Sequence, residues 1–208
     1  MDTKEGSITF ARETSDIIRL NNWIFSHIQI YIKGRTLELG SGNGAFAAMF
    51  FERGLPLHLS DELLGNREYL LKRFQGITTM KMIHEIDFHD ISSTQTYADM
   101  AGVFSTVIAI NITEHGIYDK LTLLSAKHFL RIRGHFIAVI PSNAVLFNNM
   151  ASSLEDLKEY NLRIARNLMG ESFEILKVRY FEWSPGPKSL AFDQPGLYTL
   201  AIFRKRQT

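Results

Sequence analysis

The sequence predicts a three-layer α/β domain built around a mostly parallel sheet of seven strands. Strand-like apolar runs alternate with stretches of helical spacing over the first two thirds of the chain. Such alternation is typical of parallel sheets, because two parallel strands need a crossover connection between them, most often a helix. The last two strand-like runs, 173–181 and 197–203, follow each other without a helix. As neighbours they must pair antiparallel, so we expect an antiparallel C-terminal hairpin strand.

The N-terminal element is predicted as a helix over residues 15–32, in which isoleucine and leucine recur every three or four positions. Strands and helices then follow in the order strand 35–39, helix 45–53, strand 57–59, helix 62–74, strand 79–83, strand 105–110, helix 118–131 and strand 135–140. Glycines stand at the ends of the three helices in this series, where glycine commonly stops a helix. A further helix over residues 152–169 precedes the terminal strands.

Composition and charge exclude several classes of protein. The chain has no cysteine, which excludes disulfides and thiolate metal sites and is typical of a reducing cytoplasm. The 23 basic and 22 acidic residues are spread along the chain, so we expect no nucleic-acid partner. The 7 histidines share no ligand spacing, so no metal site is expected. With no signal peptide and no membrane span, we expect a soluble cytoplasmic protein.

A glycine-rich loop follows the first strand, in the segment Thr-Leu-Glu-Leu-Gly-Ser-Gly-Asn-Gly at residues 36–44. Its glycines allow a tight turn and a close approach of the backbone to a ligand, and the next helix directs its free N–H groups into the same crevice. The second strand is followed by Asp61, whose carboxylate can accept both hydroxyls of a ribose. Alternatively, Asp61 caps the next helix. Together these features predict a nucleotide site.

A carboxylate two residues before the first glycine narrows the choice of ligand. A dinucleotide site spaces its glycines as Gly-x-Gly-x-x-Gly and binds a pyrophosphate, which Glu38 would repel. The spacing here is Glu-x-Gly-x-Gly-x-Gly, which suits a ligand bearing an ammonium and a sulfonium. This segment resembles the first motif of the class I S-adenosylmethionine-dependent methyltransferases. The resemblance implies a Rossmann-like fold, S-adenosyl-L-methionine as cofactor and S-adenosyl-L-homocysteine as product.

The resemblance extends over residues 20–141 and implies a cofactor site spread over four strand ends. Asp87 matches the acid that contacts the adenine amino group, with Phe88 beside the ring, and Asn111 lies near the reacting methyl group. Asp87 can instead be an ordinary loop acid. The complete set of expected cofactor residues is Glu38, Gly40, Ser41, Gly42, Gly44, Asp61, Glu62, Asp87, Phe88 and Asn111.

Candidate catalytic residues follow the fourth strand. Glu114 and His115 would face the methyl group and supply a base if the acceptor must lose a proton, although methyl transfer chiefly needs proximity and alignment. The alternative is that His115 packs or caps at a helix start. An acceptor pocket is expected between four aromatic residues, which can equally be core residues. These are Trp23, Tyr31, Phe147 and Trp183.

We expect a single domain over residues 1–208, with a lid helix at 1–34, a cofactor-binding core at 35–141, and an acceptor-side helix and terminal hairpin at 142–208. The expected activity is methyl transfer to a small molecule such as a sugar, lipid or secondary metabolite. Two alternatives stay open, namely a non-catalytic S-adenosylmethionine-binding domain and a methyltransferase that acts on a macromolecule. The oligomeric state is not indicated by the sequence.

Overall fold

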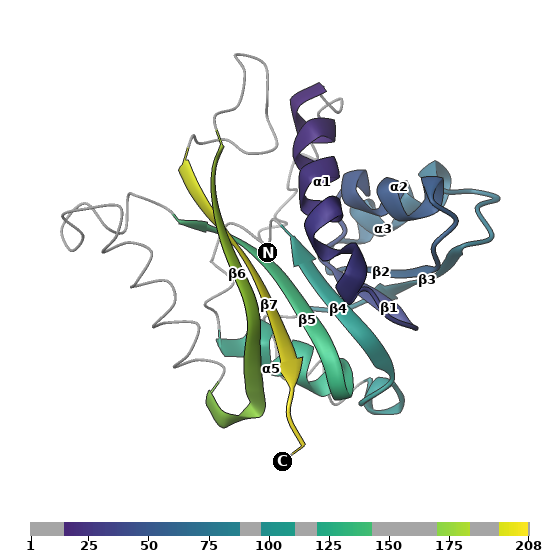
Figure 1. Ribbon diagram of the computed structural model, residues 1–208. Coiled ribbons are helices and arrows are strands. Elements are labelled where there is room, and N and C mark those ends of the chain that lie inside the picture. Colours follow the sequence, from purple (N-terminus) through teal and green to yellow (C-terminus); the bar gives the residue numbers. More distant parts are fainter. Residues whose placement is uncertain (1–14, 88–96, 111–119, 143–169, 184–195, 208) are drawn as a thin grey trace, which may run out of the picture.

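The computed structural model describes residues 15–87, 97–110, 120–142, 170–183 and 196–207. Its elements are α1 (Ser15–Ile28), η1 (Gln29–Tyr31), β1 (Thr36–Leu39), α2 (Ala45–Glu52), β2 (Leu57–Asp61), α3 (Leu64–Arg73), β3 (Met80–Glu85), η2 (Ala98–Met100), β4 (Phe104–Ile110), α5 (Lys120–Phe129), β5 (Leu130–Ser142), η3 (Gly170–Ser172), β6 (Phe173–Trp183) and β7 (Gly196–Lys205). The strands form one sheet in the order β3-β2-β1-β4-β5-β7-β6 (Figure 1).

The first five strands of the sheet are parallel, and β7 is antiparallel to both of its neighbours, β5 and β6. The predicted fold class is therefore confirmed, including the antiparallel C-terminal strand. The last strand of the chain lies inside the sheet, between β5 and β6. The carboxyl ends of β1 to β6 consequently lie along one edge of the sheet, and their amino ends lie along the other.

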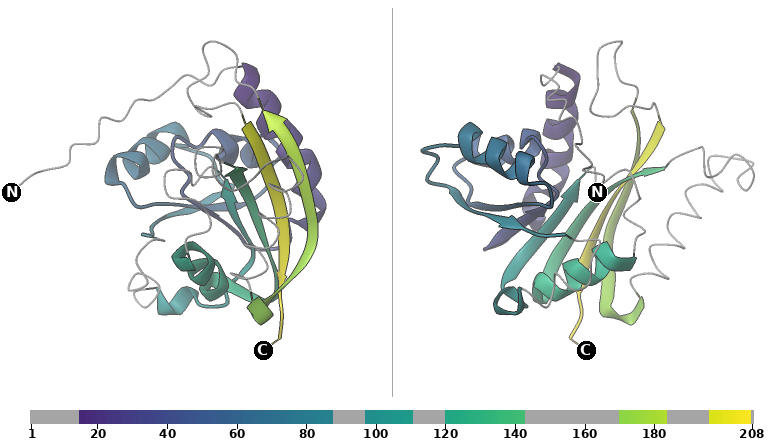
Figure 2. Two further views of the ribbon diagram at one scale, coloured as in Figure 1. Left: turned by 90° about the vertical axis from the view of Figure 1, so that its left-hand side faces the viewer. Right: turned by 180° about the vertical axis from the view of Figure 1, so that it is seen from behind.

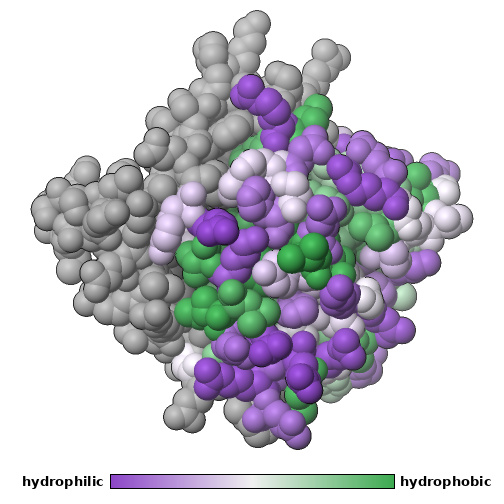
Figure 3. Space-filling view, viewed as in Figure 1, coloured by the Kyte–Doolittle hydropathy of each residue, from purple (hydrophilic) through white to green (hydrophobic). Residues whose placement is uncertain are grey.

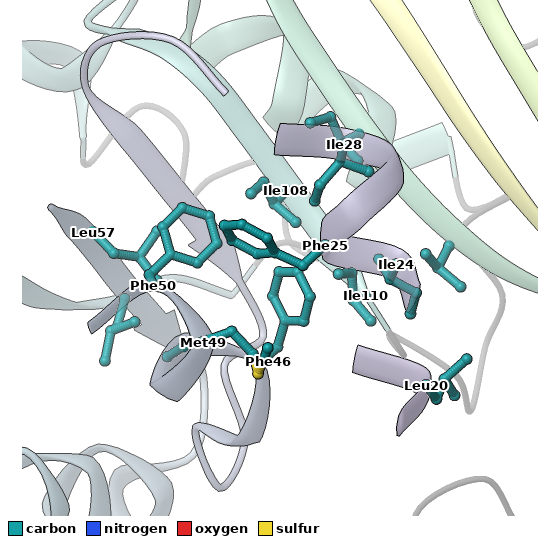
Figure 4. Packing of buried hydrophobic residues seen from close by; sticks show 14 of the residues in the cluster. Leu20, Ile24, Phe25, Ile28, Phe46, Met49, Phe50, Leu57, Ile108 and Ile110 are labelled. Atoms are coloured by element: carbon teal, nitrogen blue, oxygen red, sulfur yellow. The ribbon is translucent and has the colours of Figure 1, made fainter. Parts of the chain in front are cut away.

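Helices cover both faces of the sheet and produce the three layers. Figure 2 shows α1, α2 and α3 on one face and α5 on the opposite face. The side chains of each buried strand alternate between the two cores: Val107 and Ala109 of β4 face α5, whereas Ile108 and Ile110 face α1. Phe25 and Phe50 fix α1 against α2 through an edge-to-face contact at 5.4 Å between ring centroids (Figure 4). Among the described helices, none has the length and apolarity needed to cross a membrane.

The element boundaries differ from those predicted at a few points. The first helix ends at Ile28 and continues as a 3₁₀ turn, in a segment rich in β-branched isoleucine, which lowers helix propensity. The fifth strand begins at Leu130, directly after α5, because Leu130 pairs with Phe104 ahead of a bulge. The helix predicted at residues 152–169 lies outside the described residues.

Arg133 stands in the left-handed region, with φ of 63°, and is the one non-glycine residue there in the described part of the chain. A side chain in this conformation costs about 1–2 kcal/mol, and glycine avoids the cost. We therefore expect Arg133→Gly to raise the free energy of unfolding by roughly 0.5–1 kcal/mol after the entropic penalty of glycine. Urea denaturation measures this change. Arg131→Gly is the matched control and should lower stability; equal effects of both substitutions would contradict the prediction.

Candidate functional site

The glycine loop lies at the carboxyl edge of the sheet, between β1 and α2. Gly40, Gly42 and Gly44 have φ of 65°, 53° and 76°, a region that disfavours any residue with a Cβ atom. The Gly44 N–H donates to the Ser41 carbonyl at 2.8 Å and closes the turn. At the start of α2, the Ala45 N–H donates to the side-chain oxygen of Asn43 at 3.0 Å. The loop is thus held as a compact turn ahead of a helix N-terminus.

Two of these glycines meet very different surroundings. A Cβ atom added at Gly42 has no atom within 4 Å, so the space next to it is open. A Cβ atom added at Gly44 would lie 2.6 Å from Cε2 of Phe74 and 2.8 Å from Cδ2 of Leu70. Gly44 is therefore required for the packing of the loop on α3, whereas Gly42 leaves room for a ligand.

Glu38 is buried beneath this loop, with 4% of its surface exposed. One carboxyl oxygen, Oε2, has no hydrogen-bond partner among the described residues, while the Ser41 side chain hydrogen-bonds the carboxyl group. Burial raises the pKa of Glu38 to about 8; the Ser41 hydrogen bond opposes this rise, and the nearby charge of Asp61 adds to it. A buried acceptor without a donor lowers the stability of the fold, and a cationic or hydrogen-bonding ligand would satisfy it.

Asp61 connects the glycine loop to α3. One carboxylate oxygen, Oδ2, accepts the Gly42 N–H at 2.8 Å, and Oδ1 accepts the Leu63 N–H and the Asn66 side-chain amide, each at 3.0 Å. These bonds use about three of the roughly four acceptor positions of a carboxylate. The helix-cap alternative is thus partly realised, since Asp61 satisfies an N–H group immediately before α3, and acceptor capacity remains on Oδ2.

Three supporting residues were not predicted from the sequence. The Ser60 hydroxyl donates to the Glu38 carbonyl at 2.8 Å, and its own carbonyl accepts the Ser41 N–H at 2.7 Å. The Arg73 guanidinium donates to the Asn43 carbonyl at 2.7 Å, and Asn66 is the amide bound to Asp61. The one available signal was Ser60 itself, because it stands between the predicted strand 57–59 and Asp61.

Of the remaining expected cofactor residues, the structure describes two, Glu62 and Asp87. Glu62 is exposed just after Asp61, and Asp87 is exposed two residues beyond the end of β3. Asp61 pairs in register with Glu85, so Asp87 and Asp61 follow neighbouring strands to the same edge of the sheet. Phe88 and Asn111 lie outside the described residues.

Only some of the expected acceptor and catalytic residues lie within the described ranges. Glu114, His115 and Phe147 lie outside the described residues. The backbone of Trp183 ends β6 and pairs with Gly196 at the carboxyl edge of the sheet.

The two aromatic residues of the N-terminal segment lie at different levels. Trp23 lies midway along α1, partly buried, with its ring centroid 4.1 Å from that of His27. Tyr31 lies at the amino edge, where its carbonyl is 2.8 Å from Nδ1 of His135, at the level of the first residue of β1. The structure does not bring Tyr31 to the glycine loop, because the chain must reach this edge before β1 can begin.

Comparison with solved structures identifies the fold. An S-adenosylmethionine-dependent methyltransferase of Anabaena variabilis has a TM-score of 0.67 and 12% identity, covering 92% of this chain and 86% of its own. The N-methyltransferase NodS of Bradyrhizobium japonicum, solved with S-adenosyl-L-homocysteine, has a TM-score of 0.63 and 11% identity, covering 94% and 90%. An S-adenosylmethionine-dependent methyltransferase of Methanosarcina mazei has a TM-score of 0.62 and 14% identity, covering 88% and 98%.

The sequence identities are low, so these comparisons concern the fold alone. No protein-family model matches the sequence, and no curated protein matches it. The sheet order β3-β2-β1-β4-β5-β7-β6, the antiparallel β7 and the glycine loop after β1 are the features on which the assignment rests. The chain has the fold of the class I S-adenosylmethionine-dependent methyltransferases.

Proposed function

We propose that the chain is an S-adenosylmethionine-dependent methyltransferase with a small-molecule acceptor. The observation that carries the proposal is the unpartnered Oε2 of Glu38, buried beneath a loop whose Gly42 faces open space. A carboxyl oxygen in this position fits the ammonium group of the cofactor. The fold and the solved complex of NodS with S-adenosyl-L-homocysteine support the same assignment.

The residues of the loop fit the other parts of this cofactor as well. Gly42 would let the ligand approach the backbone, Asp61 would accept ribose hydroxyls on its remaining acceptor position, and Asp87 would contact the adenine amino group. When bound, the cofactor supplies a methyl group activated by its sulfonium. The chain's own part is to bind and align the two reactants and to exclude water from the site. Glu114 and His115 remain our candidates for accepting a proton from the acceptor.

Two features favour a small acceptor, namely the net charge of the chain and the position of Trp183 at the end of β6. The net charge of +1 offers no general attraction for a polyanionic acceptor. Trp183 stands where β6 reaches the carboxyl edge, and aromatic residues are common in pockets for small molecules. We assign Trp183, together with Trp23 and Phe147, to the acceptor side of the domain. The division into lid helix, cofactor core and acceptor segment belongs to the same proposal.

Calorimetric titration with S-adenosyl-L-homocysteine and, separately, with NAD tests the cofactor. We expect micromolar binding of S-adenosyl-L-homocysteine, a corresponding rise in melting temperature by mass action, and no binding of NAD. Tight binding of NAD without binding of S-adenosyl-L-homocysteine would overturn the proposal. Turnover of labelled cofactor with a panel of sugars, lipids and secondary metabolites separates an enzyme from a non-catalytic binding domain.

Asp61→Ala is expected to weaken S-adenosyl-L-homocysteine binding at least tenfold, because a charge-assisted hydrogen bond contributes about 1.5–3 kcal/mol. It should also lower stability, since the substitution removes the acceptor of three protein hydrogen bonds. Calorimetry and urea denaturation measure the two effects. Asp99→Ala, at an exposed position on η2, is the control and should change neither. Unchanged affinity with reduced stability would leave Asp61 a purely structural role.

A further inference from the structure

A second concave site lies at the amino edge of the sheet, away from the glycine loop. It is a pocket of about 240 Å³ lined by Gly34, Arg35, Thr36, Pro56, His58 and Lys81. These residues lie where β1, β2 and β3 begin, whereas the glycine loop lies where β1 ends. The pocket is therefore separate from the candidate cofactor site, and the proposed methyl transfer makes no use of it.

The charged side chains that line this pocket, Arg35 and Lys81, are both basic. Arg35 and Lys81 are exposed, and within the described ranges neither forms an ion pair with an acidic side chain. The Lys81 ammonium donates one hydrogen bond, to the Thr78 carbonyl at 3.1 Å, and so keeps further donors free. Two cations thus stand beside a concave surface, and no acidic side chain of the described residues forms an ion pair with either of them.

His58 completes the lining and has one ring nitrogen already committed. Its Nδ1 is 3.0 Å from Nε2 of His84 on the neighbouring strand, and the two rings are nearly parallel, at 13°. His84 is buried, and Phe104 of β4 packs edge-on against His58 at 5.2 Å. The hydrogen bond to His84 leaves Nε2 of His58 as the nitrogen available to a ligand. If His84 donates to Nδ1, then Nε2 of His58 carries its proton and is a donor.

We propose that this pocket binds a small oxyanion of the phosphate type. The Arg35 guanidinium is a planar fork of N–H donors that fits two phosphate oxygens. The Lys81 ammonium adds a second positive charge, and the Nε2–H group of His58 donates a hydrogen bond. In the view of Figure 3, hydrophilic side chains gather at the lower end of the molecule, where β7 ends beside the first residues of β5 that pair with it. A phosphate ion and the phosphate group of a small ester share the required chemistry.

The same arrangement determines how His58 should respond to an anion. Burial, together with the charges of His84, Arg35 and Lys81, lowers the pKa of His58 to about 4. An anion among these groups reverses part of that repulsion and favours the imidazolium form. Binding should therefore raise the pKa of His58 and take up a proton, while a non-specific salt effect would act on all histidines.

Nuclear magnetic resonance of the histidine ring C–H groups tests the proposal. The probes are inorganic phosphate, pyrophosphate and glycerol 3-phosphate, each titrated at constant ionic strength maintained with sodium chloride. We expect saturable shifts at His58 and His84, with a higher His58 pKa in the bound state. Tighter binding of glycerol 3-phosphate than of inorganic phosphate would identify a phosphate ester as the preferred ligand, and the reverse order a free ion.

Lys81→Gln should weaken the binding of each probe at least fivefold. Lys72→Gln is matched to it in residue type and charge, lies at an exposed position on α3, and should leave the binding unchanged. Equal losses in the two variants would overturn the proposal, as would unchanged binding in Lys81→Gln. Shifts that never saturate, or that chloride alone reproduces, would also overturn it. None of these results depends on the proposed methyltransferase activity, because no cofactor is present in the experiment.

Discussion

Replacing Glu38 by glutamine is expected to stabilise the free protein at about pH 8 and, at the same time, to weaken its binding of S-adenosyl-L-homocysteine. Glutamine has nearly the same shape as a protonated glutamate, so the packing beneath the loop is retained. The carboxyl group of Glu38 thus has an unfavourable effect on folding that we attribute to its role in binding. A stability gain coupled to a loss of affinity would be the signature of that role.

The sign of the stability effect follows from the pKa. The pKa of Glu38 is raised from 4.5 to about 8 in the folded protein, so over this interval the folded state holds a proton that the unfolded chain releases. The stability contributed by the neutral carboxyl is fully present below 4.5 and is lost as the pH rises through about 8. Each pH unit in this window costs about 1.4 kcal/mol, and the glutamine variant escapes that cost.

Affinity should change in the opposite direction. A cationic group of the ligand placed against Oε2 favours the ionised carboxylate, so wild-type binding should strengthen between about pH 6 and 8 and release a proton. The Glu38→Gln variant should bind at least tenfold more weakly near pH 8 and show neither effect. Calorimetry in two buffers of different ionisation enthalpy measures the proton release directly.

Thermal unfolding across the same pH range provides the stability measurement. In a chain of this size, a melting temperature higher by roughly 5 °C or more is expected for Glu38→Gln near pH 8. Glu52→Gln is the matched control, since Glu52 ends α2 with 69% of its side chain exposed. The control should follow the wild-type curve. Identical pH slopes in all three proteins would show that the Glu38 carboxyl finds a partner in solution.

The order of the elements could be predicted from the sequence because each depends on a local pattern. The alternation of apolar runs and helical spacings predicts the parallel strands, and the absence of a helix between the last two strands predicts their antiparallel pairing. The position of β7 between β5 and β6 depends on non-local pairing, such as Ile137 with Ile202. No local signal distinguishes that pairing from one between β5 and β6.

The candidate site shows the same division between local and non-local information. Glu38, Gly42 and Asp61 could be identified from spacing alone, because a strand, a turn and a helix N-terminus follow one another in the chain. The distinct role of Gly44 depends on Phe74, thirty positions later, and became visible only in the packing. The position of Tyr31 depends on the direction of α1 relative to β1.

The basic pocket at the amino edge could not be predicted from the sequence either. Arg35, directly before β1, and Lys81 of β3 line the same pocket, although they are far apart in a chain whose net charge is only +1. Summed charge says nothing about which cations share an edge of the sheet. The near-neutral composition therefore predicts the absence of a general attraction for polyanions, but it does not exclude a local anion site.

The glycine loop offers the second large effect, because Gly42 and Gly44 should respond differently to alanine. Gly44→Ala places a Cβ atom 2.6 Å from Phe74 and 2.8 Å from Leu70, at a residue with φ of 76°. Overpacking of this kind costs about 1–3 kcal/mol, and the left-handed conformation adds about 1–2 kcal/mol. We expect the free energy of unfolding to fall by roughly 2–5 kcal/mol.

Gly42→Ala meets no atom within 4 Å, so its effect on folding should be limited to the conformational cost of about 1–2 kcal/mol. Its methyl group would occupy the open space next to Gly42, and S-adenosyl-L-homocysteine binding should weaken at least tenfold. Gly54→Ala is the matched control, since Gly54 also has a positive φ, of 66°, and open surroundings, but lies beyond the far end of α2. Urea denaturation should show similar losses for Gly42→Ala and Gly54→Ala, while calorimetry shows an affinity loss for Gly42→Ala alone. If both variants bind normally, the space at Gly42 is not where the cofactor lies.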